Sequence, residues 1–226
     1  MSQNDVITLV QTRLAAAADP EKAAPMAAYL KTEMPFYGVQ KAGRTPIVRE
    51  LVSSYPPQTR IAYEANIRAL WALPHREEKY VALSYARAFN SFVTIDSVPL
   101  YRALIVDGAW WDLVDEAATK LVGRVVLTER DEAGPIVTKW VGDEDMWLRR
   151  TSIVCQLGHK EQTDRSLLDE ACGANLSDRE FFIRKAIGWA LREFAKTDPA
   201  WVMEWVALNE NEISGLSRRE ALKHMA

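Results

Sequence analysis

Residues 108–117, GAWWDLVDEA, contain two adjacent tryptophans followed at once by two aspartates that lie three residues apart. On a helix, Trp111 and Asp115 are related as i and i+4, so they share one face. The face of an aromatic ring attracts positive charge, and a carboxylate beside it neutralises that charge, so the pair suits a cationic guest. The alternative interpretation is structural: Asp112 or Asp115 caps a helix or bridges to an arginine, and both tryptophans pack, with Trp110 in the core.

A second candidate face lies in residues 178–196, where cations surround an aromatic residue. Lys185, Trp189, Arg192 and Lys196 fall at i, i+4, i+7 and i+11, away from an apolar stripe. Cations neutralise backbone phosphates and an aromatic ring is available to a base or sugar, so this pattern is typical of nucleic-acid binding. A solvated basic face with one tryptophan tucked under its neighbours is the alternative.

Other patterns that could carry chemistry are incomplete. Residues 38–45, GVQKAGRT, nearly fit the phosphate loop GxxxxGK[ST], but Arg44 replaces the lysine and no buried strand precedes it. The histidines show no metal-ligand spacing, so we expect neither a metal nor a cofactor. Cys155 and Cys172 form no CxxC pair, and we interpret them as buried small apolar residues of a protein from a reducing compartment.

Composition limits the protein class. The chain has 226 residues, 48% hydrophobic and 26% charged, with a net charge of -3, as in ordinary soluble domains. No stretch has the length of a membrane span, and the N-terminus lacks the basic leader of a secretory signal. The net negative charge argues against a protein that coats nucleic acid without specificity, since such proteins are basic overall. It allows a local basic face, with acidic residues such as Glu204, Glu210 and Glu212 elsewhere.

The elements that must position these residues are all predicted to be helices. Asp19–Pro20, Thr45–Pro46 and Asp198–Pro199 have the pattern of helix starts, and no convincing strand is found. The periodic segments cover about residues 3–18, 20–34, 45–54, 57–73, 75–91, 97–107, 110–121, 133–142, 145–158, 163–174, 178–196, 198–209 and 213–225.

Short links and pairs of about 35–45 residues indicate helical repeats of the HEAT or armadillo type. A compact helical bundle is the alternative. Because no linker or low-complexity tract interrupts the chain, residues 1–226 are predicted to form one domain.

Several segments in order along nearly the whole chain resemble the AlkD family of alkylpurine DNA glycosylases. They are PEKAAPMAAYLKTEMPFYGVQ, ALWALPHRE, ALIVDGAWWDLVD, MWLRRTSI, EFFIRKAIGWALREFAKTDP and LSRREALKH. The combination of WWDxVD with KAIGWxLRE is the most specific part. The resemblance implies an all-α, HEAT-like helical-repeat solenoid with a concave face that holds duplex DNA.

The resemblance also implies roles for single residues. By motif, Asp115 matches the family's catalytic aspartate, and Trp111 and Trp189 match its active-site aromatics. Arg150 and Arg192 match arginines that contact DNA, and two residues match positions near the lesion strand: Gln40 and Tyr29. Lys185 and Lys196 join the DNA-binding set through the basic face described above. The segment KAGRTP after Gln40 departs from the family's shorter run, so the contacts of this loop do not carry over.

The implied activity is hydrolysis of the N-glycosidic bond of cationic N3- or N7-alkylpurines, such as 3-methyladenine and 7-methylguanine, in duplex DNA. With no lysine nucleophile expected near WWDLVD, the sequence predicts a monofunctional glycosylase of base excision repair. We expect a monomer without cofactor, metal or membrane attachment, in the cytoplasm near the nucleoid. The alternatives are a non-catalytic binder of distorted DNA and a helical-repeat scaffold for a protein partner.

Overall fold

The computed structural model describes residues 3–225, and within this range the regular structure is helical, with no strand. The all-α class is therefore confirmed. Contacts divide the chain into two compact units, Met1–Val93 and Thr94–Ala226. Each unit is described by itself, and the single domain of residues 1–226 stays a prediction. In the described range no helix has both the length and the apolar character that a membrane crossing requires.

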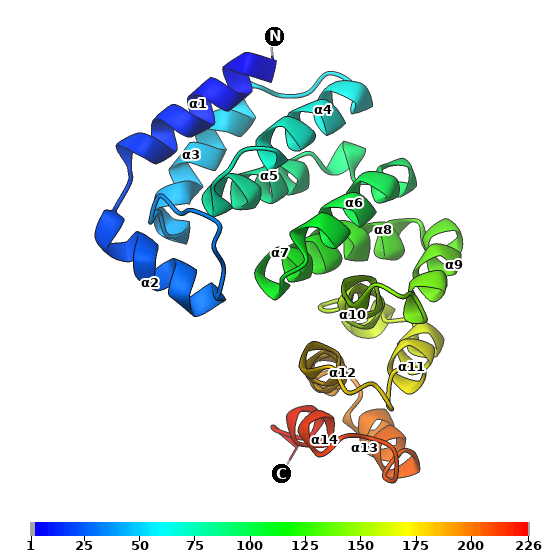
Figure 1. Ribbon diagram of the computed structural model, residues 1–226. Coiled ribbons are helices and arrows are strands. Elements are labelled where there is room, and N and C mark those ends of the chain that lie inside the picture. Colours follow the sequence, from blue (N-terminus) through cyan, green and yellow to red (C-terminus); the bar gives the residue numbers. More distant parts are fainter. Residues whose placement is uncertain (1–2, 226) are drawn as a thin grey trace. The chain divides into compact units, whose positions relative to one another are not determined.

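In the first unit, helices pack around buried tyrosine and aliphatic side chains (Figure 1). Helix α1 contacts α3 and α4, and α5 packs against the same two helices. Tyr63, Ile67 and Tyr85 are fully buried between them. The elements are α1 (Gln3–Ala16), α2 (Pro20–Leu30), α3 (Lys41–Ser54), α4 (Arg60–Trp71), α5 (Arg76–Ala88) and the short 3-10 helix η1 (Asn90–Phe92).

A buried carboxylate from α5 holds the loop that precedes α3. Glu77 is fully buried, and its Oε1 accepts the backbone N–H groups of Gly38 at 2.8 Å and Val39 at 3.0 Å. Gly38 has a φ of +83°, and a Cβ there would lie 2.0 Å from the carbonyl oxygen of Asp19, so the position requires glycine. The loop ends at Gln40, from which α3 begins.

Local helix-start signals are confirmed at two of the three predicted positions. The Asp19 side chain accepts the N–H of Lys22, and the Asp198 side chain accepts the N–H of Trp201. The prediction at Thr45–Pro46 is wrong, because α3 begins at Lys41 and contains Pro46. Tertiary contacts of the preceding loop set this start, and no side-chain cap bond is present there.

The second unit begins with the 3-10 helix η2 (Ile95–Ser97) and carries the candidate site. Its further elements are α6 (Val98–Gly108), α7 (Trp111–Glu116), the π-helix η3 (Ala117–Val122), α8 (Gly123–Thr128), α9 (Arg130–Val141), α10 (Met146–Val154), the 3-10 helix η4 (Lys160–Gln162), α11 (Arg165–Gly173), α12 (Phe181–Phe194), α13 (Pro199–Leu208) and α14 (Gly215–Ala221).

Helix pairs repeat with a nearly constant period in this unit. Helices α9, α11 and α13 begin at residues 130, 165 and 199, in steps of 35 and 34. Their partners α10, α12 and α14 begin at 146, 181 and 215, again in steps of 35 and 34. The partners form an inner row, α10 on α12 and α12 on α14, beside the outer row of α9, α11 and α13 (Figure 1). This arrangement confirms the predicted helical repeat and favours it over the compact bundle.

The helix that carries the Trp-Trp-Asp motif contains a π turn that the sequence did not reveal. It was expected to span residues 110–121, but it runs from α7 through η3 into α8 and ends at Thr128. In a π turn, hydrogen bonds join residues five apart, so the side-chain faces before and after the turn are offset. With this offset, α7 lines the cleft described in the next subsection, whereas Leu121, Val122 and Val125 after the turn are buried.

Candidate active site

The turn before α7 sends the two adjacent tryptophans to different surroundings. Helix α6 ends at Gly108, Ala109 adopts a left-handed conformation with a φ of 37°, and Trp110 is extended. Trp110 packs with Phe182 at 5.3 Å between ring centroids and with Trp147 at 6.1 Å. Trp111 begins α7 and faces the cleft described below.

Asp115 is held by both oxygens. Arg150 Nε donates to Oδ1 and Nη2 to Oδ2, each at 2.8 Å, and Nη1 donates to the carbonyl of Phe182 at 2.5 Å. The side chains are 5% exposed for Arg150 and 17% exposed for Asp115. Such a two-pronged pair fixes the plane of the carboxylate. The structural interpretation, in which an aspartate bridges to an arginine, is thus confirmed in its geometry.

Asp115 nevertheless borders solvent, because it lines an open cleft of about 480 Å³. Trp111 from α7 and Trp189 from α12 line the same cleft, so the structure brings together the three side chains predicted to be catalytic. The remaining lining residues are Asp112, Glu116, Thr119, Lys120, Leu157, Gly158 and Glu193. The predicted absence of a nearby lysine is wrong, since Lys120 follows on the same helix.

Acidic side chains predominate in this lining. Asp112, Asp115, Glu116 and Glu193 face a single lysine among the lining residues. Arg150 neutralises Asp115, and Lys196 bonds to Glu193 at 2.5 Å. Lys196, predicted to bind DNA, is therefore an exposed cation beside the cleft. With aromatic walls and this charge, the cleft favours a flat cationic group.

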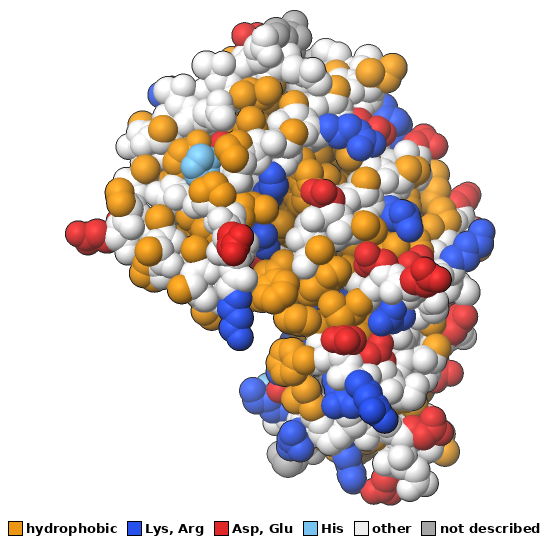
Figure 2. Space-filling model, viewed as in Figure 1, with side chains coloured by type: hydrophobic (Ala, Val, Ile, Leu, Met, Phe, Trp, Pro, Cys, Tyr) orange, Lys and Arg blue, Asp and Glu red, His pale blue; other side chains and the backbone are white. Residues whose placement is uncertain are grey.

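The basic face of α12 is tied to α14 by one carboxylate. Glu220 Oε1 accepts from Lys185 Nζ at 2.9 Å, and Oε2 accepts from Arg192 Nη1. The hydrogen bond from Lys185, joined by that from Arg192, holds the pKa of Glu220 below its usual range. Lys and Arg side chains gather on the surface over α12 and α14 (Figure 2). Lys185, Trp189 and Arg192 thus share one face of α12, as predicted.

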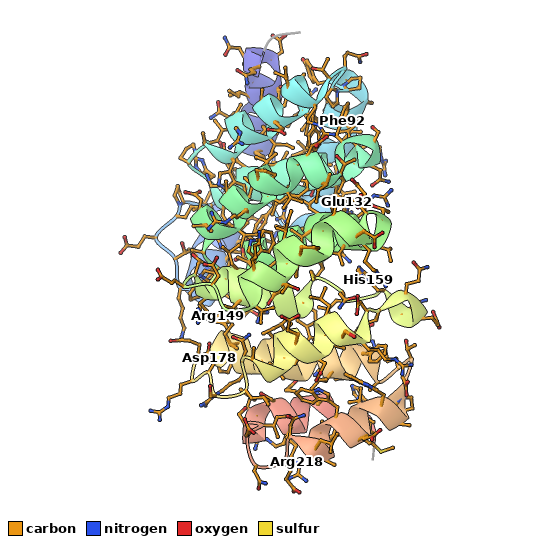
Figure 3. All side chains as sticks on the ribbon, turned by 90° about the vertical axis from the view of Figure 1, so that its right-hand side faces the viewer. Phe92, Glu132, Arg149, His159, Asp178 and Arg218 are labelled. Atoms are coloured by element: carbon orange, nitrogen blue, oxygen red, sulfur yellow. The ribbon has the colours of Figure 1, made fainter. Side chains whose placement is uncertain are left out.

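Two adjacent arginines of α10 are held by bonds within the protein. Besides Arg150, Arg149 donates to the carbonyl of Asp143 at 2.7 Å and to Asp178 Oδ2 at 3.0 Å. Figure 3 shows Arg149 and Asp178 close together at one edge of the stacked helices. The family resemblance implied that Arg150 contacts DNA. In the structure Arg150 bonds to Asp115, and a DNA contact of Arg150 stays a prediction.

The other two predicted DNA-binding residues belong to the first unit. Tyr29 lies on α2 with 75% of its surface exposed, and Gln40 is exposed at the start of α3. Their predicted approach to the lesion strand stays a prediction.

Sequence reasoning missed three acidic partners of this site: Glu193, Glu220 and Asp178. Glu193 follows Arg192 directly, and Glu220 lies inside the LSRREALKH segment that carried the resemblance. Their partners are up to 35 positions away, as Glu220 is from Lys185. Spacing along one helix carries no signal for the contacts of Glu220 and Asp178, whereas the i, i+3 spacing of Glu193 and Lys196 could have revealed that pair.

Neither cysteine is available for chemistry. Cys155 and Cys172 are fully buried, as predicted. Burial raises the pKa of the Cys155 thiol to about 12 and raises that of Cys172 above its usual range. Among residues 3–225, no group of three or more His, Cys, Asp or Glu side chains could hold a metal ion.

Comparisons with known proteins agree with this fold. A search of curated proteins gives no match. A solved structure described as a predicted DNA alkylation repair enzyme from Enterococcus faecalis is 33% identical, with a TM-score of 0.85; the match covers 92% of this chain and 97% of that one. The family model for DNA alkylation repair enzymes matches residues 10–225. The chain therefore belongs to the DNA alkylation repair enzyme family.

Proposed function

We propose that this protein is a monofunctional DNA glycosylase of the AlkD type, with a HEAT-like repeat fold. Its substrates are cationic N3- and N7-alkylpurines, such as 3-methyladenine and 7-methylguanine, in duplex DNA. Family membership supports the role in alkylation repair. One observation carries the proposal further: Asp115, Trp111 and Trp189 line a single cleft.

The chemistry needs few groups because an alkylated cationic purine is already a good leaving group. As its bond to C1′ breaks, positive charge develops on the deoxyribose. A carboxylate placed there stabilises that charge by about 3 kcal/mol, by analogy with single oxyanion-hole donors. The faces of Trp111 and Trp189 each add about 0.5–2 kcal/mol for a cationic guest.

Arg150 prepares Asp115 for this task. A carboxylate offers about four lone-pair sites, and the two N–H bonds from Arg150 occupy only part of them. The oxygens keep capacity for a water or for the charged sugar on the cleft side. Arg150 therefore acts as a positioning residue, because it fixes the carboxylate without blocking it.

Buried thiols argue against another way of repairing an alkylated base, transfer of the alkyl group to a cysteine. The thiolate is the reactive form. Both cysteines are fully buried, and burial raises the pKa of each. The support for base removal comes from the residues of the cleft, Asp115, Trp111 and Trp189.

Binding to DNA would use cations outside the cleft. Lys185 and Arg192 on α12 and Lys196 in the turn after it are the proposed phosphate contacts, with Arg150, Gln40 and Tyr29 as further DNA contacts. A protein that neutralises several phosphates loses affinity steeply with salt, by about 10³-fold or more between about 50 and 200 mM for six or more contacts.

The test is release of free 7-methylguanine from a duplex, measured with intact protein, together with strand cleavage before and after heating. Release without cleavage before heating is the expected result. Salt-dependent binding without release would identify a non-catalytic DNA binder, and absence of salt-dependent binding would identify a protein scaffold. Cleavage before heating that Lys120→Ala removes would show a lyase and overturn the monofunctional assignment.

A further inference from the structure

Helix α14 lies directly on the centre of α12. A Cβ added to Gly188 would lie 2.5 Å from the Cβ of Glu220 and 2.8 Å from the carbonyl oxygen of Ser217. Ser217 is buried, and its hydroxyl donates to the carbonyl of Arg184 at 2.9 Å. The two helices are thus locked together at the residue next to Trp189.

This close approach places one carboxylate between two cations. Glu220 bonds Lys185 with one oxygen and Arg192 with the other, across a distance of two helical turns. Trp189 lies between these two cations in sequence and on the same face of α12. The three charged side chains are 20–38% exposed, so the cluster is reachable from solvent.

We propose that Glu220 is a positioning residue that fixes Lys185 and Arg192 on either side of Trp189, at the cost of some attraction for DNA. This inference rests on the proposed function. A carboxylate between two cations occupies the place that a phosphate oxygen would take, so it holds both side chains in a phosphate-binding arrangement before DNA arrives. It also cancels one of their two charges, which lowers the attraction for any phosphate.

Replacing Glu220 should therefore lower the rate of base release without lowering the affinity for duplex DNA. Without it, two uncompensated cations remain, and affinity for undamaged duplex stays equal or rises, with a steeper dependence on salt. The cations are also free to move, and Trp189 loses its fixed surroundings at the cleft. A displacement of about 1 Å can cost up to about 10²-fold in rate, so we expect base release to slow about tenfold.

The experiment compares Glu220→Gln with the wild type in single-turnover release of 7-methylguanine at saturating protein, and in binding of undamaged duplex across salt concentrations. Glu210→Gln is the control, because it removes the same charge from an exposed pair with Arg218 that does not line the cleft. The expected result is a release rate about tenfold lower, duplex affinity not below wild type, and no change in the control.

A release rate within about twofold of wild type, or a loss that a higher protein concentration restores, would overturn the positioning role. If the glutamine variant melts early, Glu220→Asp serves instead: it keeps the charge but is too short to reach both cations, and the same split is expected. If the wild type itself releases no base, the proposed function fails. The role of Glu220 is then tested only by the affinity for undamaged duplex, and weaker duplex binding by the glutamine variant would refute that role.

Discussion

Replacing Arg150 by methionine should lower both the free energy of unfolding and the rate of base release. The substitution keeps much of the buried volume but leaves the Asp115 carboxylate and the Phe182 carbonyl without three N–H donors. Breaking a buried ion pair from one side costs about 3–5 kcal/mol. Because Asp115 keeps 17% exposure at the cleft, we expect about 3 kcal/mol, the lower end of that range.

Asp115→Asn leaves the Arg150 charge only partly bonded, and should cost about 2 kcal/mol. In the double variant neither unpaired charge remains, so the two losses should fall short of additivity by about 2 kcal/mol. Base release behaves differently: it should be low in both single variants and stay low in the double variant. Recovered stability without recovered activity separates the structural contribution of the pair from the chemical one.

Urea unfolding followed by circular dichroism measures these free energies, and single-turnover base release measures the rate. Arg13→Met is the matched control, since Arg13 makes an equally two-pronged bond to Glu50, at 2.8 and 2.6 Å, on the exposed surface. It should change stability little, because water replaces the lost partner. A loss below about 1 kcal/mol for Arg150→Met, or strictly additive losses, would refute the reasoning.

Three further predictions concern packing, thiols and pH. Gly188→Ala should destabilise the protein by about 1–3 kcal/mol, because its Cβ would lie 2.5 Å from that of Glu220. The control is Gly134→Ala, where a Cβ meets nothing within 4 Å, and it should leave stability equal or higher. Thermal melts of the two variants and the wild type measure the difference. Both cysteines should resist a thiol reagent in the native protein and react in urea; rapid native labelling would contradict their burial. Burial lowers the pKa of His159 to about 4 from 6.5, so its neutral form stabilises the fold fully above pH 6.5, and that stability is lost as pH falls toward 4. Melts of His159→Phe should depend less on pH across this window than those of wild type, and equal slopes would refute the assignment.

Local sequence signals predicted the helices well where the deciding contacts are local. Asp19 and Asp198 cap their own helices, and those starts could be read directly. The start of α3 could not, because Glu77, nearly forty residues away, holds the preceding loop. The π turn after Glu116 was also missed, since its hydrophobic pattern resembles that of an ordinary helix.

In the candidate site, too, the features set by local spacing were predicted and the contacts between distant helices were not. The i, i+4 spacing of Trp111 and Asp115 predicted a shared face, and the cleft contains both. The spacing did not reveal that Arg150 holds Asp115 or that Glu220 joins Lys185 to Arg192. Those contacts depend on how α10 and α14 pack against their neighbours.

The central claim is that the Asp115 carboxylate acts at the reacting sugar. It is tested most directly by single-turnover release of 7-methylguanine from duplex DNA by the wild type, Asp115→Asn and Asp107→Asn. Asp107 is an exposed aspartate of α6 that does not line the cleft, so it controls for loss of one charge. We expect release by the wild type and by Asp107→Asn, and a rate at least about tenfold lower for Asp115→Asn with duplex binding intact. Equal rates for all three proteins would contradict the claim.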